Sequence, residues 1–452
     1  MRVAVIGTGY VGLTTGVALA YLGHKVVGVD KDPSKIALLS KGKSPIHEPG
    51  IEELLVEIKR EQLTFTEDTA AAVRDAELIM IAVGTPAKAN GEADTSYVEA
   101  AAEEVAQSIE EGKRYILVVK STVPIGTNRR VSHVIEQVLK KRGIQAHVYL
   151  ASNPEFLREG LALRDTFYPD RIVVGSESPE AVEALRRLYR PILEQTFNPP
   201  GFLPRPESYD LPPLITTDPT SAEMIKYAAN ACLALKISFI NEIAGLCEKV
   251  GADVVEVARG IGLDARIGPA FLGAGIGWGG SCFPKDTAAL LAMGREYNYA
   301  MPIVAAAREV NWRQRERVIE KLQSALKVLR GSVIGVLGLA FKPGTDDVRE
   351  SPAIDVVRLL LERGAHVRVH DPVAVENARK ELGSRVEYYD NVYELARDAD
   401  ALVLATEWSQ YFDLDFAELA GRMRQKVFVD GRNIFTPSEV TRWGFIYMGM
   451  GR

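Results

Sequence analysis

Two kinds of hydrophobic pattern alternate along the first part of the chain. Short apolar runs occupy 3–6, 25–30, 78–83, 115–122 and 147–152, and we expect each to form a strand. Apolar residues at helical spacing lie between these runs, most clearly over 11–23, 97–111 and 127–142. Strands that alternate with helices predict a parallel, doubly wound sheet.

A fainter version of this pattern returns near the other end of the chain. Strand-like runs at 333–341 and 366–371 flank a helical stretch at 351–364, and apolar runs follow at 399–406 and 426–431. We interpret this echo as a second α/β domain of the nucleotide-binding type.

The segment between the two patterns has a different character. Residues 219–329 are mainly helical, with apolar positions recurring at helical spacing through 221–250 and 303–326. A proline-dense stretch at 197–213 is expected to be an ordered surface loop. The sequence therefore predicts a first domain over 1–200, a central helical connector over 201–329 and a second domain over 330–452.

Composition narrows the classes of function. A chain of 452 residues that is 47% hydrophobic can bury more than one core. Its 54 Lys and Arg against 60 Asp and Glu give a net charge of −6 without a long basic run, so neither nucleic acid nor an anionic membrane is an expected partner. The N-terminus runs directly into a strand pattern, and no apolar stretch approaches the roughly 20 residues that span a bilayer. We expect a cytoplasmic protein that acts on small molecules.

Three glycines follow the first strand in the segment "GTGYVG". Gly7, Gly9 and Gly12 lie between that strand and the first helix, where glycines let the backbone turn tightly and approach a pyrophosphate. Asp30 ends the second strand, where a carboxylate accepts hydrogen bonds from a ribose diol and repels a 2′-phosphate. The pattern favours NAD over NADP; a glycine turn that binds nothing is the alternative. The fold class expected is α/β, with two Rossmann-like doubly wound domains joined by a central long-helix connector.

The segment "GIGWGGSCFPKD" at 275–286 contains one of only three cysteines. Four glycines leave little bulk to pack, so we expect backbone and thiol to be approachable rather than part of a core. A thiol can trap an aldehyde as a thiohemiacetal that is oxidised to a thioester and hydrolysed, which makes Cys282 a candidate nucleophile. Free cysteines are more often small buried apolar residues, which is the preferred reading of Cys232 and Cys247. Their odd number and wide spacing suggest neither a disulfide framework nor a metal cluster.

Two pairs of polar residues recur at a four-residue spacing. Lys226 and Asn230 share a helix face, where a cation and an amide donor could stabilise an oxyanion; a surface lysine beside a packing asparagine is the alternative. Glu155 and Glu159 follow a strand end, where like charges could raise one pKa for acid–base work; a solvated turn is the alternative.

The segments "GGSCFPKD", "STVPIGT", "SNPEFLREG" and "SAEMIKYAANA" resemble the UDP-glucose dehydrogenase family of NAD-dependent, four-electron sugar-nucleotide dehydrogenases. The resemblance runs from Met1 to about Phe435 in the right order. Related GDP-mannose dehydrogenases carry leucine where this chain has Phe283, and UDP-N-acetylmannosamine dehydrogenases carry histidine at Ser281, so both positions point to UDP-glucose. The resemblance implies oxidation of UDP-glucose to UDP-glucuronate with NAD bound by 1–200 and the uridine end by 330–452, catalysis in the cleft between them, and a homodimer formed through the central helices.

The resemblance also assigns roles to individual residues. The catalytic set is Cys282, Lys226, Asn230, Asp286, Thr122 and Glu155, with Asp286 and Thr122 handling the hydrolytic water. The cofactor set is Gly7, Gly9, Val11, Gly12, Asp30, Lys35, Thr85, Thr122, Glu159, Lys285 and Arg349. The substrate set is Glu155, Phe156, Leu157, Arg158, Glu159, Lys226, Asn230, Arg266, Phe271, Leu272, Gly273, Ala274, Gly275, Gly279, Lys342 and Arg432.

This sequence departs from the family pattern at two places. Gly273 stands where the animal enzymes have a lysine, and the proline-rich segment is an insertion, which leaves one diphosphate contact and the oligomer open. Arg432 could reach substrate or be a structural arginine. Two functional alternatives also stay open: another sugar-nucleotide dehydrogenase, and a non-catalytic NAD-binding module that keeps the fold without turnover.

Overall fold

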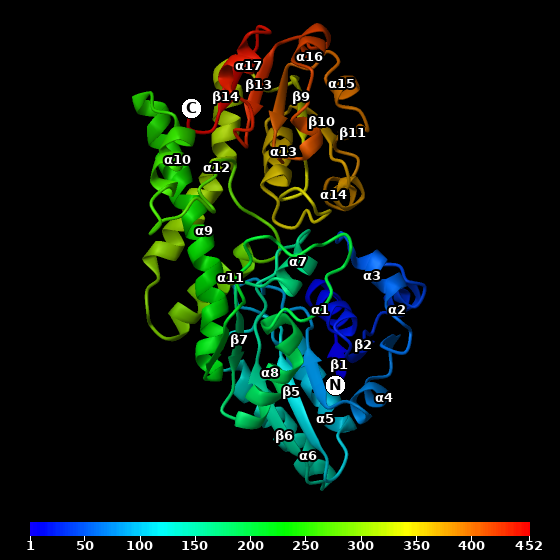
Figure 1. Ribbon diagram of the computed structural model, residues 1–452. Coiled ribbons are helices and arrows are strands. Elements are labelled where there is room, and N and C mark those ends of the chain that lie inside the picture. The colour runs from blue at the N-terminus through cyan, green and yellow to red at the C-terminus, as the bar shows by residue number, and fades with distance from the viewer. The chain divides into compact units, whose positions relative to one another are not determined.

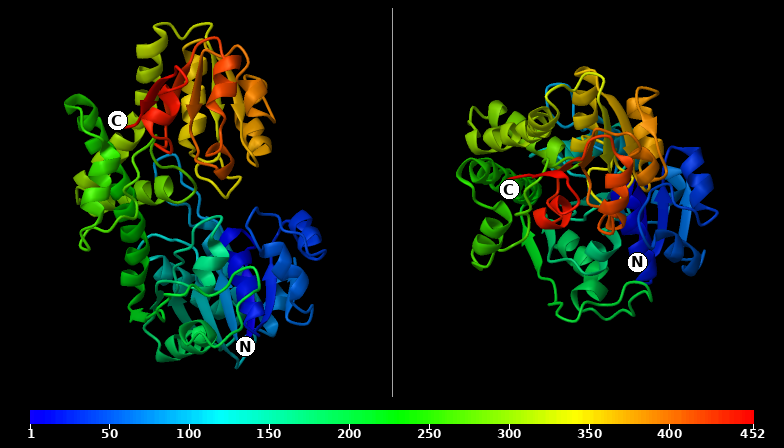
Figure 2. Two further views of the ribbon diagram at one scale, coloured as in Figure 1. Left: turned by 45° about the horizontal axis from the view of Figure 1, so that its top comes forward. Right: turned by 90° about the horizontal axis from the view of Figure 1, so that it is seen from above.

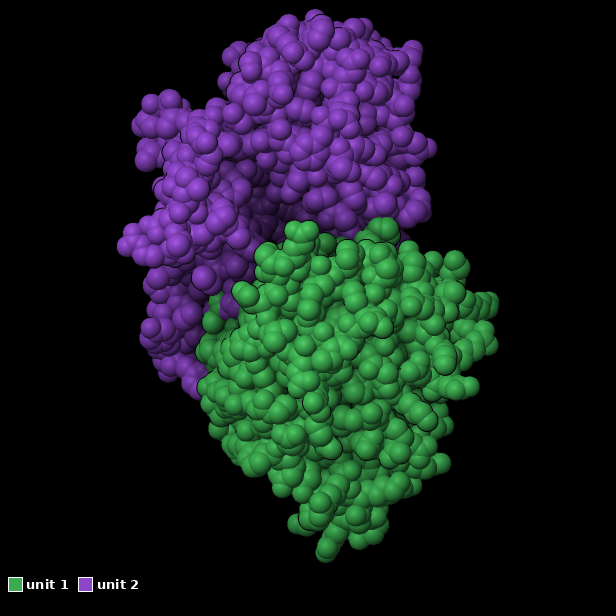
Figure 3. Space-filling view, in the orientation of Figure 1, with its two compact units in different colours: residues 1–228 green, residues 229–452 purple.

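The computed structural model describes residues 1–452, which fall into two compact units. Unit 1 is Met1–Ala228 and unit 2 is Ala229–Arg452 (Figure 3). Each unit is built on one sheet.

The sheet of unit 1 has eight strands in the order β3-β2-β1-β4-β5-β6-β7-β8. The strands are β1 (Arg2–Ile6), β2 (Lys25–Val29), β3 (Leu63–Thr66), β4 (Leu78–Ile81), β5 (Arg114–Val119), β6 (His147–Ser152), β7 (Ile172–Gly175) and β8 (Leu214–Thr217). The first six pair in parallel, whereas β7 runs antiparallel to β6. The order of those six is that of the dinucleotide-binding fold, so the predicted parallel sheet is confirmed.

Eight helices connect these strands (Figure 1). They are α1 (Tyr10–Tyr21), α2 (Pro33–Leu39), α3 (Ile51–Glu57), α4 (Thr69–Arg74), α5 (Ser96–Ser108), α6 (Thr127–Arg142), α7 (Ala162–Phe167) and α8 (Pro179–Leu193). The proline-dense residues 197–213 form neither helix nor strand, as predicted, and lead into β8.

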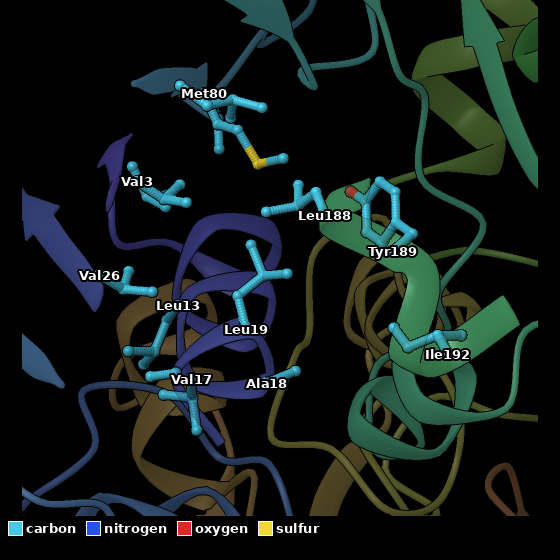
Figure 4. Packing of buried hydrophobic residues seen from close by; sticks show 14 of the residues in the cluster. Val3, Leu13, Val17, Ala18, Leu19, Val26, Met80, Leu188, Tyr189 and Ile192 are labelled. Carbon is cyan, nitrogen blue, oxygen red and sulfur yellow. The ribbon is translucent and has the colours of Figure 1, made fainter. Parts of the chain in front are cut away.

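Alternate residues of the central strands are buried on opposite faces of this sheet. Val3 and Val5 of β1 join a core with α1, α7 and α8, whereas Ala4 and Ile6 join a core with α4, α5 and α6. Figure 4 shows part of the first core, with Leu19 of α1 between Val3 of β1 and Leu188 of α8. Because strands covered on both faces must be apolar throughout, these segments read as continuous hydrophobic runs in the sequence.

One long helix, α9 (Pro219–Val250), contains the boundary between the units (Figures 1 and 2). Its 32 residues make it about 48 Å long. Contrary to the expectation that no apolar stretch approaches membrane-spanning length, α9 is long and apolar enough to qualify, with a mean hydropathy of 1.2 and 44% of the window buried within the protein. A single such helix is weak evidence for a membrane span, because the core helix of a globular protein passes the same test.

Unit 2 repeats the order of the first six strands of the unit 1 sheet. Its six parallel strands are ordered β11-β10-β9-β12-β13-β14. They are β9 (Val333–Leu337), β10 (His366–His370), β11 (Glu387–Tyr388), β12 (Ala401–Leu404), β13 (Val427–Asp430) and β14 (Ile446–Gly449). The weak echo in the sequence is therefore a second sheet of the same topology.

Unit 2 contains eight helices besides its part of α9. They are α10 (Val254–Gly262), α11 (Phe283–Glu296), α12 (Pro302–Leu326), α13 (Pro352–Glu362), α14 (Val375–Leu382), α15 (Val392–Leu395), α16 (Phe416–Arg422) and α17 (Pro437–Thr441), with a short 3₁₀ helix at Ser409–Tyr411. Val318, Ile319 and Leu322 of α12 pack into the same core as α13 and the strands. The end of the predicted connector thus contributes to the core of unit 2, while the three-part domain division stays a prediction.

Candidate active site

The glycine turn after β1 is shaped by its own packing. Gly7 has φ +100°, and a Cβ there would lie 2.8 Å from the Ala82 carbonyl oxygen. A Cβ on Gly12 would lie 1.9 Å from the Gly7 carbonyl oxygen, so both positions require glycine. Gly9 differs, because it precedes α1 and a Cβ there would meet nothing within 4 Å. The open space over Gly9, beside the first turn of α1 that contains Val11, is where a pyrophosphate fits.

Asp30 follows β2 and faces this turn. Its Oδ2 accepts hydrogen bonds from the backbone nitrogen (2.9 Å) and the hydroxyl (2.7 Å) of Thr8, and its Oδ1 accepts one from Asp32 N (3.1 Å). Burial alone would raise the pKa of Asp30, but these hydrogen bonds and the charge of Lys35, 3.4 Å away, bring it below its ordinary value. The carboxylate is therefore ionised, and Oδ1 keeps capacity for a ribose hydroxyl. This donor and acceptor set fits NAD.

The aspartate at the corresponding position of unit 2 accepts a different set of hydrogen bonds. Asp371 follows β10, but its Oδ2 accepts from Leu339 N, Ala340 N and Trp408 Nε1, and its Oδ1 accepts from Val373 N and Ala374 N. Five donors within the protein occupy a carboxylate that is 4% exposed. Unit 2 therefore lacks, at this position, a carboxylate with the free hydrogen-bonding capacity that Asp30 has in unit 1.

Thr85 and Thr122 lie in the loops after β4 and β5. The Thr85 hydroxyl donates to the Thr122 carbonyl oxygen at 2.8 Å, and the neighbouring Ser121 hydroxyl donates to the Val83 carbonyl oxygen at 2.7 Å. Both loops leave the carboxyl ends of the strands, beside the glycine turn and Asp30. Ligands bind at this edge of open α/β sheets, so the structure brings these cofactor candidates together.

A buried ion pair links the loop after β6 to α9. Lys226 Nζ lies 3.0 Å from Glu155 Oε1, with side chains 3% and 7% exposed. Burial opposes ionisation, yet the charge and hydrogen bond of Lys226, with the Leu157 backbone nitrogen at 2.8 Å, hold the pKa of Glu155 below its ordinary value. The idea that paired glutamates raise a pKa is therefore wrong for Glu155, because the charges nearest to it are those of Lys226 and Lys120. The alternatives of a surface lysine and a solvated turn are wrong too.

The rest of this loop is also fixed by contacts within unit 1. Phe156 lies beneath the Arg171 guanidinium, 3.7 Å from its carbon to the ring centre, and 5.5 Å from Lys226 Nζ. Arg158 is paired with Asp165 at 2.6 Å, and Glu159 is buried. The sequence missed Glu48, whose oxygens accept from Gly160 N (2.6 Å) and Ala162 N (2.7 Å). The only signal in the sequence is a glutamate directly before Pro-Gly.

The glycine-rich segment before the candidate nucleophile is buried, contrary to expectation. Residues 274–280 are all buried. A Cβ on Gly277, whose φ is +102°, would lie 2.5 Å from Asn311 Oδ1, and one on Gly279 would lie 2.1 Å from the Glu350 carbonyl oxygen. A Cβ on Gly280 would lie 2.7 Å from the Phe341 ring. The glycines make room for neighbouring protein atoms, so the view that they expose the segment is wrong.

Polar side chains of α12 and α13 hold this segment in place. Asn311 accepts from Trp278 N (2.7 Å) and donates to the Trp278 carbonyl oxygen (3.0 Å). Arg315 donates to the same oxygen (3.1 Å) and pairs with Asp355 at 3.0 Å. Arg432 donates to the carbonyl oxygens of Gly277 (3.4 Å) and Phe341 (3.5 Å). It also pairs with Glu407 at 3.1 Å, which favours its structural reading.

Cys282 lies at the N-terminus of α11 and is partly exposed. The N-terminus of a helix favours negative charge, so this position suits a thiolate, although the Cys282 side chain accepts no capping hydrogen bond here. Asp286, one turn on and 1% exposed, accepts from Asn230 Nδ2 at 2.6 Å and pairs with Lys285 at 2.5 Å. Cys282, Asp286, Asn230 and Lys285 are thus brought together in unit 2. Of the remaining thiols, Cys247 is buried as expected, whereas Cys232 is exposed.

The other substrate candidates are less closely grouped. Arg266 is 90% exposed and paired with Asp264, Lys342 lies over the Phe341 ring at 5.4 Å, and Arg349 pairs with Asp347 at 2.7 Å. In the segment Phe271–Gly275, Leu272 and Ala274 are buried and Gly273 is exposed. The roles of all these residues stay predictions.

A dinucleotide-binding turn with an ionised aspartate is typical of a nicotinamide-dependent dehydrogenase, and a thiol at a helix N-terminus beside a buried carboxylate is a candidate nucleophile. Residues 1–193 match the NAD binding domain of the UDP-glucose/GDP-mannose dehydrogenase family, 220–313 its central domain and 335–437 its UDP binding domain. The chain belongs to this family, and its cofactor is NAD.

Individual relatives resemble the chain over nearly its whole length. It is 46% identical to the UDP-glucose 6-dehydrogenase of Rhizobium meliloti, with 100% of both chains covered. It is 42% identical to a UDP-glucose dehydrogenase structure from Pyrobaculum islandicum, which covers 99% of this chain and 97% of that one with a TM-score of 0.88. A UDP-D-ManNAc dehydrogenase structure from Pyrococcus horikoshii is 29% identical, covers 100% of this chain and 99% of that one, and has a TM-score of 0.85.

Proposed function

We propose that this enzyme oxidises UDP-glucose to UDP-glucuronate, using two NAD and one water and a covalent bond to Cys282. The observation that carries the proposal is the cluster at the start of α11, where Cys282 stands one turn before the buried Asp286 and its partner Asn230. The relatives named for UDP-glucose are 46% and 42% identical, against 29% for the UDP-D-ManNAc dehydrogenase and 32% for a GDP-mannose dehydrogenase structure, which supports UDP-glucose over the alternatives.

The residues of the chain account for each bond change. NAD, when bound, accepts a hydride from the sugar carbon in each oxidation. The first oxidation removes a hydride and the hydroxyl proton from the primary alcohol, and Cys282 Sγ then adds to the aldehyde carbon to give a thiohemiacetal. Loss of a second hydride and the hydroxyl proton leaves a thioester. Water then adds to its carbonyl, the carbon–sulfur bond breaks, and the acid leaves with the thiol restored.

Charged and amide groups stabilise the oxygen atoms formed on this route. Lys226 and Asn230 lie four apart on α9 and so share a helix face, where a cation and an amide donor can stabilise the thiohemiacetal oxygen. Asp286 is the acceptor that can take a proton from the hydrolytic water, and the role of Thr122 in orienting that water stays an expectation from the family resemblance.

The test is the stoichiometry of NADH formed with a panel of sugar nucleotides. We expect two NADH per UDP-glucose and no free aldehyde, with UDP-galactose, GDP-mannose and UDP-N-acetylmannosamine much poorer substrates. One NADH per sugar, with aldehyde released, would contradict the thioester route. No NADH with any of the four would favour a binding module without turnover.

We also propose that the enzyme is a cytoplasmic homodimer. Phe239, Leu246 and Val250 of α9 are 49%, 59% and 67% exposed, at a spacing that places them along one side of the helix. The three free thiols fit a reducing compartment. Leu246→Glu should shift the protein from dimer to monomer in sedimentation velocity, whereas Val56→Glu, at a residue 78% exposed in unit 1, should not. A native monomer would overturn the dimer.

A further inference from the structure

Lys120 is a buried cation that none of the roles above uses. It follows β5 at the carboxyl edge of the sheet and is 7% exposed. Its Nζ lies 3.1 Å from Asn153 Oδ1, 3.5 Å from the Asn153 carbonyl oxygen and 3.4 Å from the Tyr189 hydroxyl. A buried ammonium is costly unless it is paired and hydrogen-bonded, so this set of acceptors is a built site for the charge.

Asn153 connects Lys120 to three elements. Its backbone nitrogen donates to the Val119 carbonyl oxygen at 2.9 Å, and its Nδ2 donates to the Val173 carbonyl oxygen of β7 at 2.7 Å. Its Oδ1 accepts from the Tyr189 hydroxyl of α8 at 2.6 Å. Lys120 and Asn153 therefore lock the ends of the neighbouring strands β5 and β6, with α8 behind them.

The hydrogen bonds between Lys120 and Asn153 fix the start of the two loops that contain the proposed catalytic residues. Thr122 comes two residues after Lys120, and Glu155 comes two residues after Asn153. A neutral side chain could have filled the same space at lower cost in desolvation, because Lys120 is only 7% exposed. The charge itself therefore needs an explanation.

Three titratable side chains face Lys120 from the elements around it. They are Glu155 from the loop after β6, Lys226 from α9 and Tyr189 from α8. Burial raises the pKa of Tyr189, so its hydroxyl stays neutral. Burial also lowers the pKa of Lys120 to about 8, with Glu155 opposing this shift and Lys226 adding to it. Lys120 is thus a cation near neutral pH that loses its charge in mildly alkaline solution.

We propose that Lys120 is a positioning residue for the reaction: its ammonium locks Asn153 and, with Lys226, keeps Glu155 ionised and in place. The proposal rests on the proposed function, since the loops that it fixes are those of Thr122 and Glu155. When Lys120 loses its proton, the lock on Asn153 weakens and Glu155 loses part of the positive charge around it. Activity should then fall although no group in contact with substrate has changed.

The experiment measures kcat/KM for UDP-glucose between about pH 6 and 10, since this ratio reports ionisations of the free enzyme. The native enzyme should lose activity as pH rises through about 8. Lys120→Met should lower kcat/KM about 10–100-fold near neutral pH and should abolish this alkaline decrease, the basic limb of the pH profile. The KM for NAD should stay within about twofold of the native value. Lys120→Arg keeps its charge throughout the range, so it should retain more activity than Lys120→Met and also lack the limb.

Tyr189→Phe is the matched control, because it removes a hydrogen-bond partner and leaves the ammonium; its limb should remain. A limb near pH 8 that persists in Lys120→Met or Lys120→Arg, or full activity in Lys120→Met, would overturn the proposal. So would a native profile without such a limb, which needs no variant to fold. If the native enzyme makes no NADH from UDP-glucose, the proposed function itself is wrong. If the native enzyme makes NADH but the variants do not show the pH profiles expected above, only the inference about Lys120 is wrong.

Discussion

Removing the charge of Lys226 tests whether its ion pair with Glu155 stabilises unit 1. Lys226→Met keeps the length of the side chain but leaves a carboxylate that is 7% exposed without the ammonium that lies 3.0 Å away. Breaking a buried pair from one side costs about 3–5 kcal/mol, because the remaining charge stays buried. We expect a loss of that size in the free energy of unfolding at pH 8.

The loss should depend on pH in a defined direction. In the native protein the pKa of Glu155 is below its ordinary value of 4.5, so the stability that it contributes is present above that value and is lost as pH falls through the lower folded pKa. In Lys226→Met burial should prevail and raise the pKa, so the penalty is absent below about 4.5, grows as pH rises from there to the raised pKa, and stays constant above it. The difference between the two proteins should therefore shrink from pH 8 to pH 5.

Urea unfolding at both pH values, followed by circular dichroism, measures this difference; the first transition is compared, because two units need not unfold together. Glu155→Gln in the Lys226→Met background removes the stranded charge and should restore most of the lost stability at pH 8. An equal loss at pH 5 and pH 8, or no recovery in the double variant, would refute the reasoning.

The remaining predictions concern the cofactor turn, the ribose acid and the thiol. Gly9→Ala should leave the melting temperature nearly unchanged but should weaken NAD binding at least about tenfold in calorimetry. Gly12→Ala should lower the melting temperature, because its Cβ would lie 1.9 Å from the Gly7 carbonyl oxygen. Native enzyme should prefer NAD over NADP, and Asp30→Ala should narrow the ratio of kcat/KM values about tenfold or more; equal native turnover with both would contradict the ribose role. Cys282→Ala should abolish UDP-glucuronate formation while Cys232→Ala does not, and Cys282→Ser should accumulate an acyl ester visible in the intact mass.

Much of the fold could be predicted from the sequence, because strands buried on both faces and amphipathic helices leave regular patterns. Asp30 and the glycine turn were found for the same reason: their roles depend on residues close by in the chain. What could not be predicted depends on distant partners. Glu155 was expected to respond to Glu159, its neighbour in sequence, but it responds to Lys226. Lys120 was read as the end of a strand, since nothing local shows that Asn153 and Tyr189 lie beside it.

The environment of the glycine-rich segment could not be predicted either, because it also depends on residues distant in the sequence. A run of glycines indicates that something approaches the backbone closely, but not what approaches it. Here the neighbours of Gly277 and Gly280 are Asn311 and the Phe341 ring, both from the protein itself.

The contrast between Asp30 and Asp371 limits how this protein could be redesigned. A second dinucleotide cannot be gained in unit 2 by altering the surface, because the carboxylate that would receive it already holds the backbone of its own turn through Leu339 and Ala340. Replacing Asp371 would release those donors and loosen the turn before any ligand could bind. A titration should therefore saturate at one NAD per chain, and variants that seek new cofactor chemistry have one turn to work with, the one beside Gly9.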